Sequence, residues 1–155
     1  MPETHRRIFF RDSTPTNKTE YARAIITRFA THAFRRPATS DEVDRLVKFV
    51  DLAQKQGDNF ERGVQLALQA VLVSPHFLFR GELQLEPDNA AAVFPVDEFA
   101  LASRLSYFLW SSMPDEELSA LAEKGRLRKN LDSQVRRMLK DPKSRALVEN
   151  FGLIW

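Results

Sequence analysis

The residue with the clearest chemical potential in this sequence is His76, which follows Ser74 and Pro75 after an apolar segment. An imidazole in such a place could be an axial haem ligand or a general base. The alternative is structural, with the ring capping a carbonyl and filling a half-buried gap. We favour the structural role, because no second ligand and no carboxylate stands at a motif-like spacing from His76.

Three charged residues are candidates for structural or interaction roles. Arg104 is set among apolar residues, and Arg80 follows a run of them. Each either pairs with a carboxylate of another helix or faces a ligand, and we favour pairing because long arginine stems pack well on apolar faces. Asp115 opens an acidic run at an expected helix N-terminus, where the helix dipole stabilises carboxylates. We favour that role over a catalytic acid cluster.

Motifs for catalysis or cofactor binding are missing from the sequence. It has no Gly-rich phosphate loop, no HExxH and no GxSxG. It has no Cys, which excludes a disulfide, a thiolate metal site and covalent c-type haem within this chain. The basic pairs at 35–36 and 136–137 are interpreted as solvated faces. We therefore assign no catalytic residue, no metal site and no cofactor to this chain, with His76 as the one weak candidate for a cofactor ligand.

Charge is unevenly distributed although the net charge is only +2, too small to favour binding to nucleic acid. Residues 82–117 hold eight Asp/Glu and one Lys/Arg, whereas residues 124–145 hold nine Lys/Arg and two Asp/Glu. Either the two blocks screen one another across one small bundle, which we favour, or one of them docks on another domain.

Membrane insertion is not indicated. No apolar run is long enough to cross a bilayer. The first eleven residues are polar and basic, without the apolar segment of a signal peptide. We expect any targeting signal to lie outside this chain.

Hydrophobic periodicity predicts an all-α fold of about seven helices in an irregular orthogonal bundle. The first helix covers about 19–34, the second follows a capping box formed by Thr39 and Glu42, and the third ends before Ser74, which caps a short turn. The remaining helices are expected at about 97–110, from a cap at Ser112 to Gly125, after Asn130, and from Asp141 onward. The segments at 64–73 and 97–110 are the most apolar, so we expect them to be the most buried.

Two sequential helical modules are expected. Residues 1–18 form an arm or linker, 19–83 a first module, 84–95 a linker rich in turn residues, and 96–155 a second module. Trp155 falls inside an apolar helical pattern without a cap, which predicts that the second module is cut short.

Two stretches resemble a known family. They are residues 22–37 continuing to 69–80, and residues 102–115, and the resemblance covers about 5–155. Together they resemble the paired domains of unknown function of large planctomycete-type proteins, which often carry a cytochrome c module elsewhere. The resemblance implies an extracytoplasmic, helical, multidomain protein, with haem possible elsewhere in the parent chain.

We therefore expect a non-catalytic structural or interaction module whose partners are other domains of the same parent chain. The alternative is part of an enzyme or redox assembly whose active site is completed by segments outside this chain. A non-covalent haem or anion-binding module is a weaker third hypothesis. By itself, this chain is not expected to be an enzyme.

Overall fold

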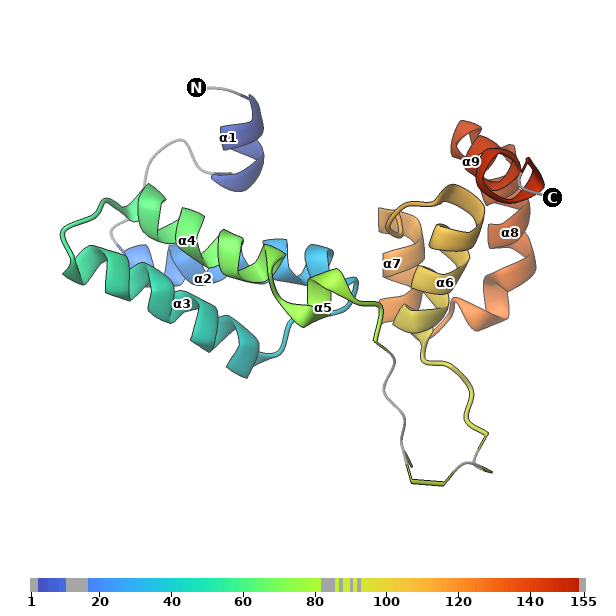
Figure 1. The fold of residues 1–155 in the computed structure, drawn as a ribbon, viewed down its shortest axis with the longest axis horizontal. Coiled ribbons are helices and arrows are strands. Elements are labelled where there is room, and N and C mark those ends of the chain that lie inside the picture. Colours follow the sequence, from blue (N-terminus) through green and yellow to red (C-terminus); the bar gives the residue numbers. More distant parts are fainter. Residues whose placement is uncertain are drawn as a thin grey trace. The chain divides into compact units, whose positions relative to one another are not determined.

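The computed structural model describes residues 3–10, 17–81, 86, 88, 89, 91 and 93–153. All regular structure in these residues is helical, which confirms the all-α prediction. Among these helices, none combines the length and apolarity needed to span a membrane. The chain divides into two compact units, residues 1–79 and 80–155 (Figure 1).

Three long helices that pack against one another form the first unit: α2 (Lys18–Phe34), α3 (Ser40–Lys55) and α4 (Phe60–Leu72) (Figure 1). Each is preceded by a residue whose side chain accepts a backbone N–H of the first turn, namely Asn17, Thr39 and Asn59. Thr39 and Glu42 form the predicted capping box. The turn after α3 places Gly57 at a φ of 90°, a left-handed conformation that favours glycine.

The core of the first unit lies between these three helices. Its largest fully buried side chains are Ile25, Ile26, Val50, Val64 and Val71. Gly63 marks a close approach of α4 to α3, because a Cβ there would lie 3.0 Å from the Val50 Cα and 3.1 Å from its Cγ1. The two helices therefore pack with no room for a side chain at this position.

The N-terminal segment differs from the expected arm, because it contains a short helix, α1 (Glu3–Ile8). Ile8 and Phe9 pack against the first core, and the Phe9 ring lies 6.3 Å from the Phe60 ring. Two helical turns are too few to show the apolar repeat on which the sequence prediction relied.

A second short helix, α5 (Pro75–Leu78), closes the first unit. As predicted, Ser74 is its N-cap and Pro75 is its first residue.

The second unit is built from α6 (Glu98–Trp110), α7 (Glu116–Glu123), α8 (Leu131–Lys140) and α9 (Arg145–Leu147) (Figure 1). Two 3₁₀ turns, η1 (Arg128–Asn130) and η2 (Pro142–Ser144), and a π-helical turn, η3 (Val148–Gly152), complete it. Its core comprises Ala102, Leu109, Trp110, Leu118, Ala122, Leu127 and Met138.

Two expectations for the second unit are wrong in detail. Asp115, and not Ser112, is the N-cap of α7, because its carboxylate accepts the N–H of Leu118. The helix expected from Asp141 onward starts there but is broken into η2, α9 and η3. Trp155, on which the prediction of a truncated module depended, lies outside the described residues.

Burial follows the prediction for α4 as far as Val71, but Leu72 and Val73 are 41 % and 71 % exposed. It does not follow the prediction for α6. Only four residues of α6 are buried, whereas α2 buries seven. Phe108 on α6 is 61 % exposed. Some apolar side chains of α6 are therefore left uncovered by the described part of the second unit.

Candidate functional site

The side chains with chemical potential in the first unit meet where α2 turns into α3 and α5 lies alongside. We call Arg35, Arg36, Thr39, Glu42 and His76 the corner cluster. Arg36 donates two hydrogen bonds to the Glu42 carboxylate, at 2.7 Å to Oε1 and 3.0 Å to Oε2. The Thr39 N–H donates to Oε2 at 2.8 Å, and His76 Nε2 lies 3.3 Å from Oε1.

Glu42 is the buried centre of this cluster, with its side chain only 9 % exposed. The hydrogen bonds from Arg36 hold the pKa of Glu42 down at about 2, outweighing burial, which would raise it. The Thr39 N–H and the charge of Arg36 and His76 act in the same direction. At neutral pH Glu42 is therefore a fixed anion and a poor proton acceptor.

His76 has a carboxylate beside it that no motif-like spacing in the sequence indicated. The spacing of 34 residues hid Glu42, because only the packing of α5 beside the capping box brings the two together. The Nε2 atom of the imidazole faces this carboxylate. The ring is 52 % exposed and packs against the Phe34 ring at 5.3 Å.

Arg35 uses its guanidinium differently from its neighbour. It donates to three backbone carbonyls in and after α5, those of His76 at 2.9 Å, Phe79 at 3.0 Å and Phe77 at 3.3 Å. The basic pair at 35–36 was expected to be a solvated face, and that expectation is wrong. Arg35 caps α5 and Arg36 neutralises Glu42.

A second polar cluster surrounds Trp110 in the second unit. Arg137 donates to the two oxygens of Asp115 at 2.7 and 3.2 Å, and to Gln134 at 2.8 Å. Gln134 in turn donates to Glu117 at 2.7 Å. The Arg137 guanidinium also lies 5.5 Å from the Trp110 ring centroid.

Within the Trp110 cluster, Asp115 is the N-cap of α7 and pairs with Arg137. Burial alone would raise the pKa of Asp115, but hydrogen bonds from Arg137 and the Leu118 N–H lower it below its usual value. Trp110 Nε1 donates to the Met138 carbonyl at 3.0 Å, which satisfies its buried N–H. Arg137, expected to be solvated, is instead central to the packing.

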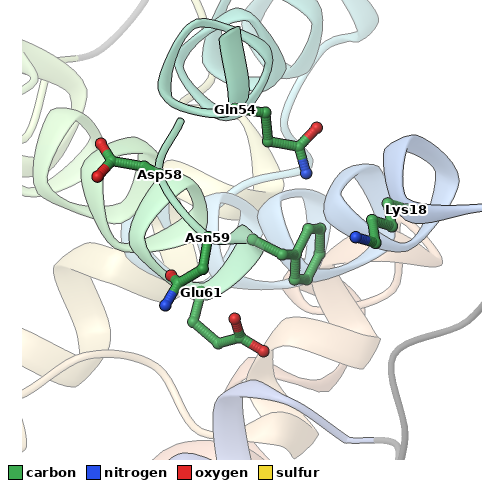
Figure 2. Close-up of a pocket in the computed structure, with 6 residues that line it drawn as sticks. Lys18, Gln54, Asp58, Asn59 and Glu61 are labelled. Atoms are coloured by element: carbon green, nitrogen blue, oxygen red, sulfur yellow. The ribbon is translucent and has the colours of Figure 1, made fainter. Parts of the chain in front are cut away.

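One surface hollow of about 420 Å³ lies in the first unit, where α3 ends and α4 begins. It is lined by Lys18, Gln54, Asp58, Asn59, Phe60 and Glu61, and Figure 2 shows the labelled side chains spread around it without converging on one point. Asn59 already accepts the Arg62 N–H as the cap of α4. The hollow contains no histidine, and within the described residues no group of three His, Asp or Glu could hold a metal ion.

Family models match both halves of the chain. Residues 21–82 match PSD5, Protein of unknown function (DUF1595), and residues 96–155 match PSD4, Protein of unknown function (DUF1592). The chain carries these two domains in tandem. The expected pairing of domains of unknown function is thereby confirmed. No curated protein and no solved structure matches the chain.

The remaining candidates are Arg80, near the end of the DUF1595 match, and Arg104, in the DUF1592 match. The guanidinium of Arg80 lies over the Tyr107 ring at 4.6 Å from the centroid, so the contact found is with an aromatic ring. Arg104 lies on the exposed side of α6. Neither residue converges with Asp115 or with a histidine in the described contacts.

Ion pairs link the acidic block at 82–117 to the basic block at 124–145. Arg137 joins Asp115 and also lies 3.3 Å from Glu117, and Arg128 lies 3.8 Å from Glu98. The Glu98 carboxylate also accepts the N–H of Leu127 at 2.6 Å. These contacts agree with our favoured interpretation, in which the blocks screen one another.

Proposed function

We propose that this DUF1595–DUF1592 pair is a non-catalytic structural or interaction module of a multidomain extracytoplasmic protein. Its partners would be other domains of the same parent chain, among them a cytochrome c module that supplies the haem. The observation that carries the proposal is a contrast. The strongest chemical candidates are occupied by internal contacts, whereas large apolar side chains remain exposed.

The occupied candidates are those of the two polar clusters. Glu42 is neutralised by Arg36, and Asp115 is held by Arg137 while it caps α7. A catalytic carboxylate needs a free oxygen and a pKa near the working pH, but the pKa of each of these two is lowered. The clusters therefore favour folding over proton transfer.

One group of exposed apolar side chains lies where η3 meets the C-terminal end of α6. The Phe108 and Phe151 rings meet at 6.3 Å and are 61 % and 56 % exposed. Val148 and Leu153, in η3 and directly after it, are 58 % and 74 % exposed. Neighbouring exposed aromatics and aliphatics of this kind are typical of protein interaction surfaces.

A second candidate function is part of an enzyme or redox assembly completed by other segments. The His76–Glu42 pair favours it, because a histidine oriented by a carboxylate is a common general base. Arg36 argues against it, because the guanidinium already takes both carboxylate oxygens. The module hypothesis accounts for more of the contacts.

The test is binding between this chain and the separately produced remaining domains of its parent protein, measured by calorimetry. We expect saturable binding that weakens at least about tenfold in the Phe108→Ser/Phe151→Ser variant, since buried aromatics dominate interface energies. Phe49→Ser, at a residue of α3 that is 42 % exposed, is the matched control and should bind normally. No binding, or equal binding of both variants, would reject the proposal.

A further inference from the structure

The contacts that hold α5 in place are mostly polar. None of its four residues is buried, and Leu78 and the adjoining Phe79 are 59 % and 68 % exposed. Phe77 and the His76 ring are the α5 side chains seen to pack against the first core, and neither is fully buried. A helix of one turn has no stability of its own, so its position depends on these few contacts.

Arg35 supplies the largest group of those contacts. Its guanidinium reaches the carbonyls of His76, Phe77 and Phe79, which are the acceptors that the end of a short helix leaves without intrahelical partners. The only other polar side-chain contact between α5 and the long helices that the structure defines is His76 to Glu42. Removing Arg35 should therefore release α5 without disturbing the buried core.

The backbone at Arg35 adopts an energetically unfavourable conformation where it makes this contact. Its φ is 59° and its ψ is 22°, a left-handed conformation that is unfavourable for a residue other than glycine. This conformation ends α2 and turns the chain toward Arg36, so that adjacent side chains reach α5 and Glu42 separately. A strained backbone conformation of this kind persists where the surrounding contacts hold it in place.

We propose that α5 is a latch that detaches and re-docks as a unit while α2, α3 and α4 stay folded, with Arg35 as its positioning residue. Residues 74–80 connect the first unit to the second along the chain. The four residues of α5 would span roughly 13 Å when extended, whereas four residues of α-helix span about 6 Å. Opening the latch would lengthen the connection between the two units, and this inference does not depend on the proposed function.

Amide hydrogen exchange resolved by NMR tests the latch in the intact chain. The amides to follow are Phe77, Leu78 and Phe79, which donate to Ser74 and Pro75 at 2.9–3.0 Å. We expect them to exchange faster than the core amides of α4. Their exchange rates should depend little on denaturant at low concentration, because local opening exposes little surface.

Two variants identify Arg35 as the positioning residue. Arg35→Met should raise exchange at these three amides at least about tenfold and leave α4 unchanged. Arg35→Gly removes the same contacts but relieves the backbone strain. It should therefore release α5 in a protein that is folded at least as well as the parent chain. Arg45→Met, at an exposed arginine of α3, is the matched control and should alter neither segment.

Three results would overturn the latch. The first is that α5 amides exchange only with the global unfolding of the first unit. The second is that the two Arg35 variants accelerate amide exchange equally in α4 and α5. The third is that neither variant changes α5 exchange. If Arg35→Met is too unstable to assess, the result for Arg35→Gly tests the proposal, because glycine adopts the left-handed conformation without strain.

Discussion

Single residues of the corner cluster make the stability of the first unit dependent on pH. The pKa of Glu42 falls from 4.5 to about 2 on folding. Its contribution is therefore fully present above pH 4.5 and is lost as the pH falls toward 2. From that shift we expect an effect on the order of 3 kcal/mol.

Glu42→Gln tests this effect by urea unfolding followed by circular dichroism at pH 5, 4 and 3. The variant should be less stable than the parent at pH 5, and the difference should shrink at each lower pH. A difference that stays constant over this range would mean that Glu42 does not titrate with folding.

Asp115 has two structural tasks, which two substitutions separate. Asp115→Asn keeps a capping oxygen but loses the ion pair, and should cost about 1 kcal/mol. Asp115→Ala loses both and should cost about 2–3 kcal/mol, because Arg137 is then left half-buried without its main partner. The measurement is the urea midpoint of the second unit.

The control for Asp115 is Asp132→Ala. Asp132 pairs with Arg136 on an exposed helical face, where an ion pair contributes only about 0.5 kcal/mol. If this variant loses as much stability as Asp115→Ala, burial does not explain the role of Asp115.

These residues could be picked out from the sequence as candidates, but most of their partners could not. The Thr39–Glu42 capping box could be predicted, because both members lie in one helical turn. His76 beside Glu42, and Arg137 beside Asp115, could not be predicted. Contacts across 34 and 22 positions depend on how helices pack, and no local pattern encodes that packing.

At the scale of helices, the contact between α3 and α4 depends on one glycine. Gly63→Ala gains up to about 1 kcal/mol of helix propensity but pushes a methyl group to 3.0 Å from the Val50 backbone. Overpacking of this kind costs about 1–3 kcal/mol, so we expect net destabilisation. Thermal unfolding followed by circular dichroism measures it.

Gly152→Ala provides the comparison for Gly63. A Cβ at Gly152 would meet its nearest neighbour, Val148 Cγ1, at an ordinary 3.8 Å. This variant should be neutral within about 0.5 kcal/mol. Equal losses at the two glycines would show that the close approach at Gly63 is not the cause.

Helix positions were more predictable than helix ends and burial. Caps and glycines at Thr39, Gly57 and Ser74 marked boundaries that the structure confirms. The predicted cap is Ser112, but Asp115, three residues later, accepts an N–H of the first turn of α7. Both residue types are good caps, and local sequence does not rank them.

At the scale of the whole chain, we predict that the candidate cofactor ligand, His76, holds no haem. His76 Nε2 lies at a buried carboxylate, and the ring is packed on Phe34 at the surface. We expect no saturable Soret shift when haem is added to the purified chain, as recorded by absorption spectroscopy. A shift that disappears in His76→Ala would contradict this and favour electron transfer.

The helical class and the tandem pair of domains were accessible from the sequence, since periodicity and motif residues are local properties. The division of the chain between Phe79 and Arg80 is a property of the folded cores. It falls a few residues before the end of the DUF1595 match, and the polar contacts of α5 lie directly before it.

The position of Trp110 has a practical consequence for spectroscopy. The chain has two tryptophans, Trp110 and Trp155, and both belong to the unit formed by residues 80–155. Tryptophan fluorescence therefore reports on that unit alone, with Trp110 inside its core. Far-ultraviolet dichroism records the helices of both units. Comparing the two signals in one titration separates the unfolding of the DUF1595 domain from that of the DUF1592 domain without a label.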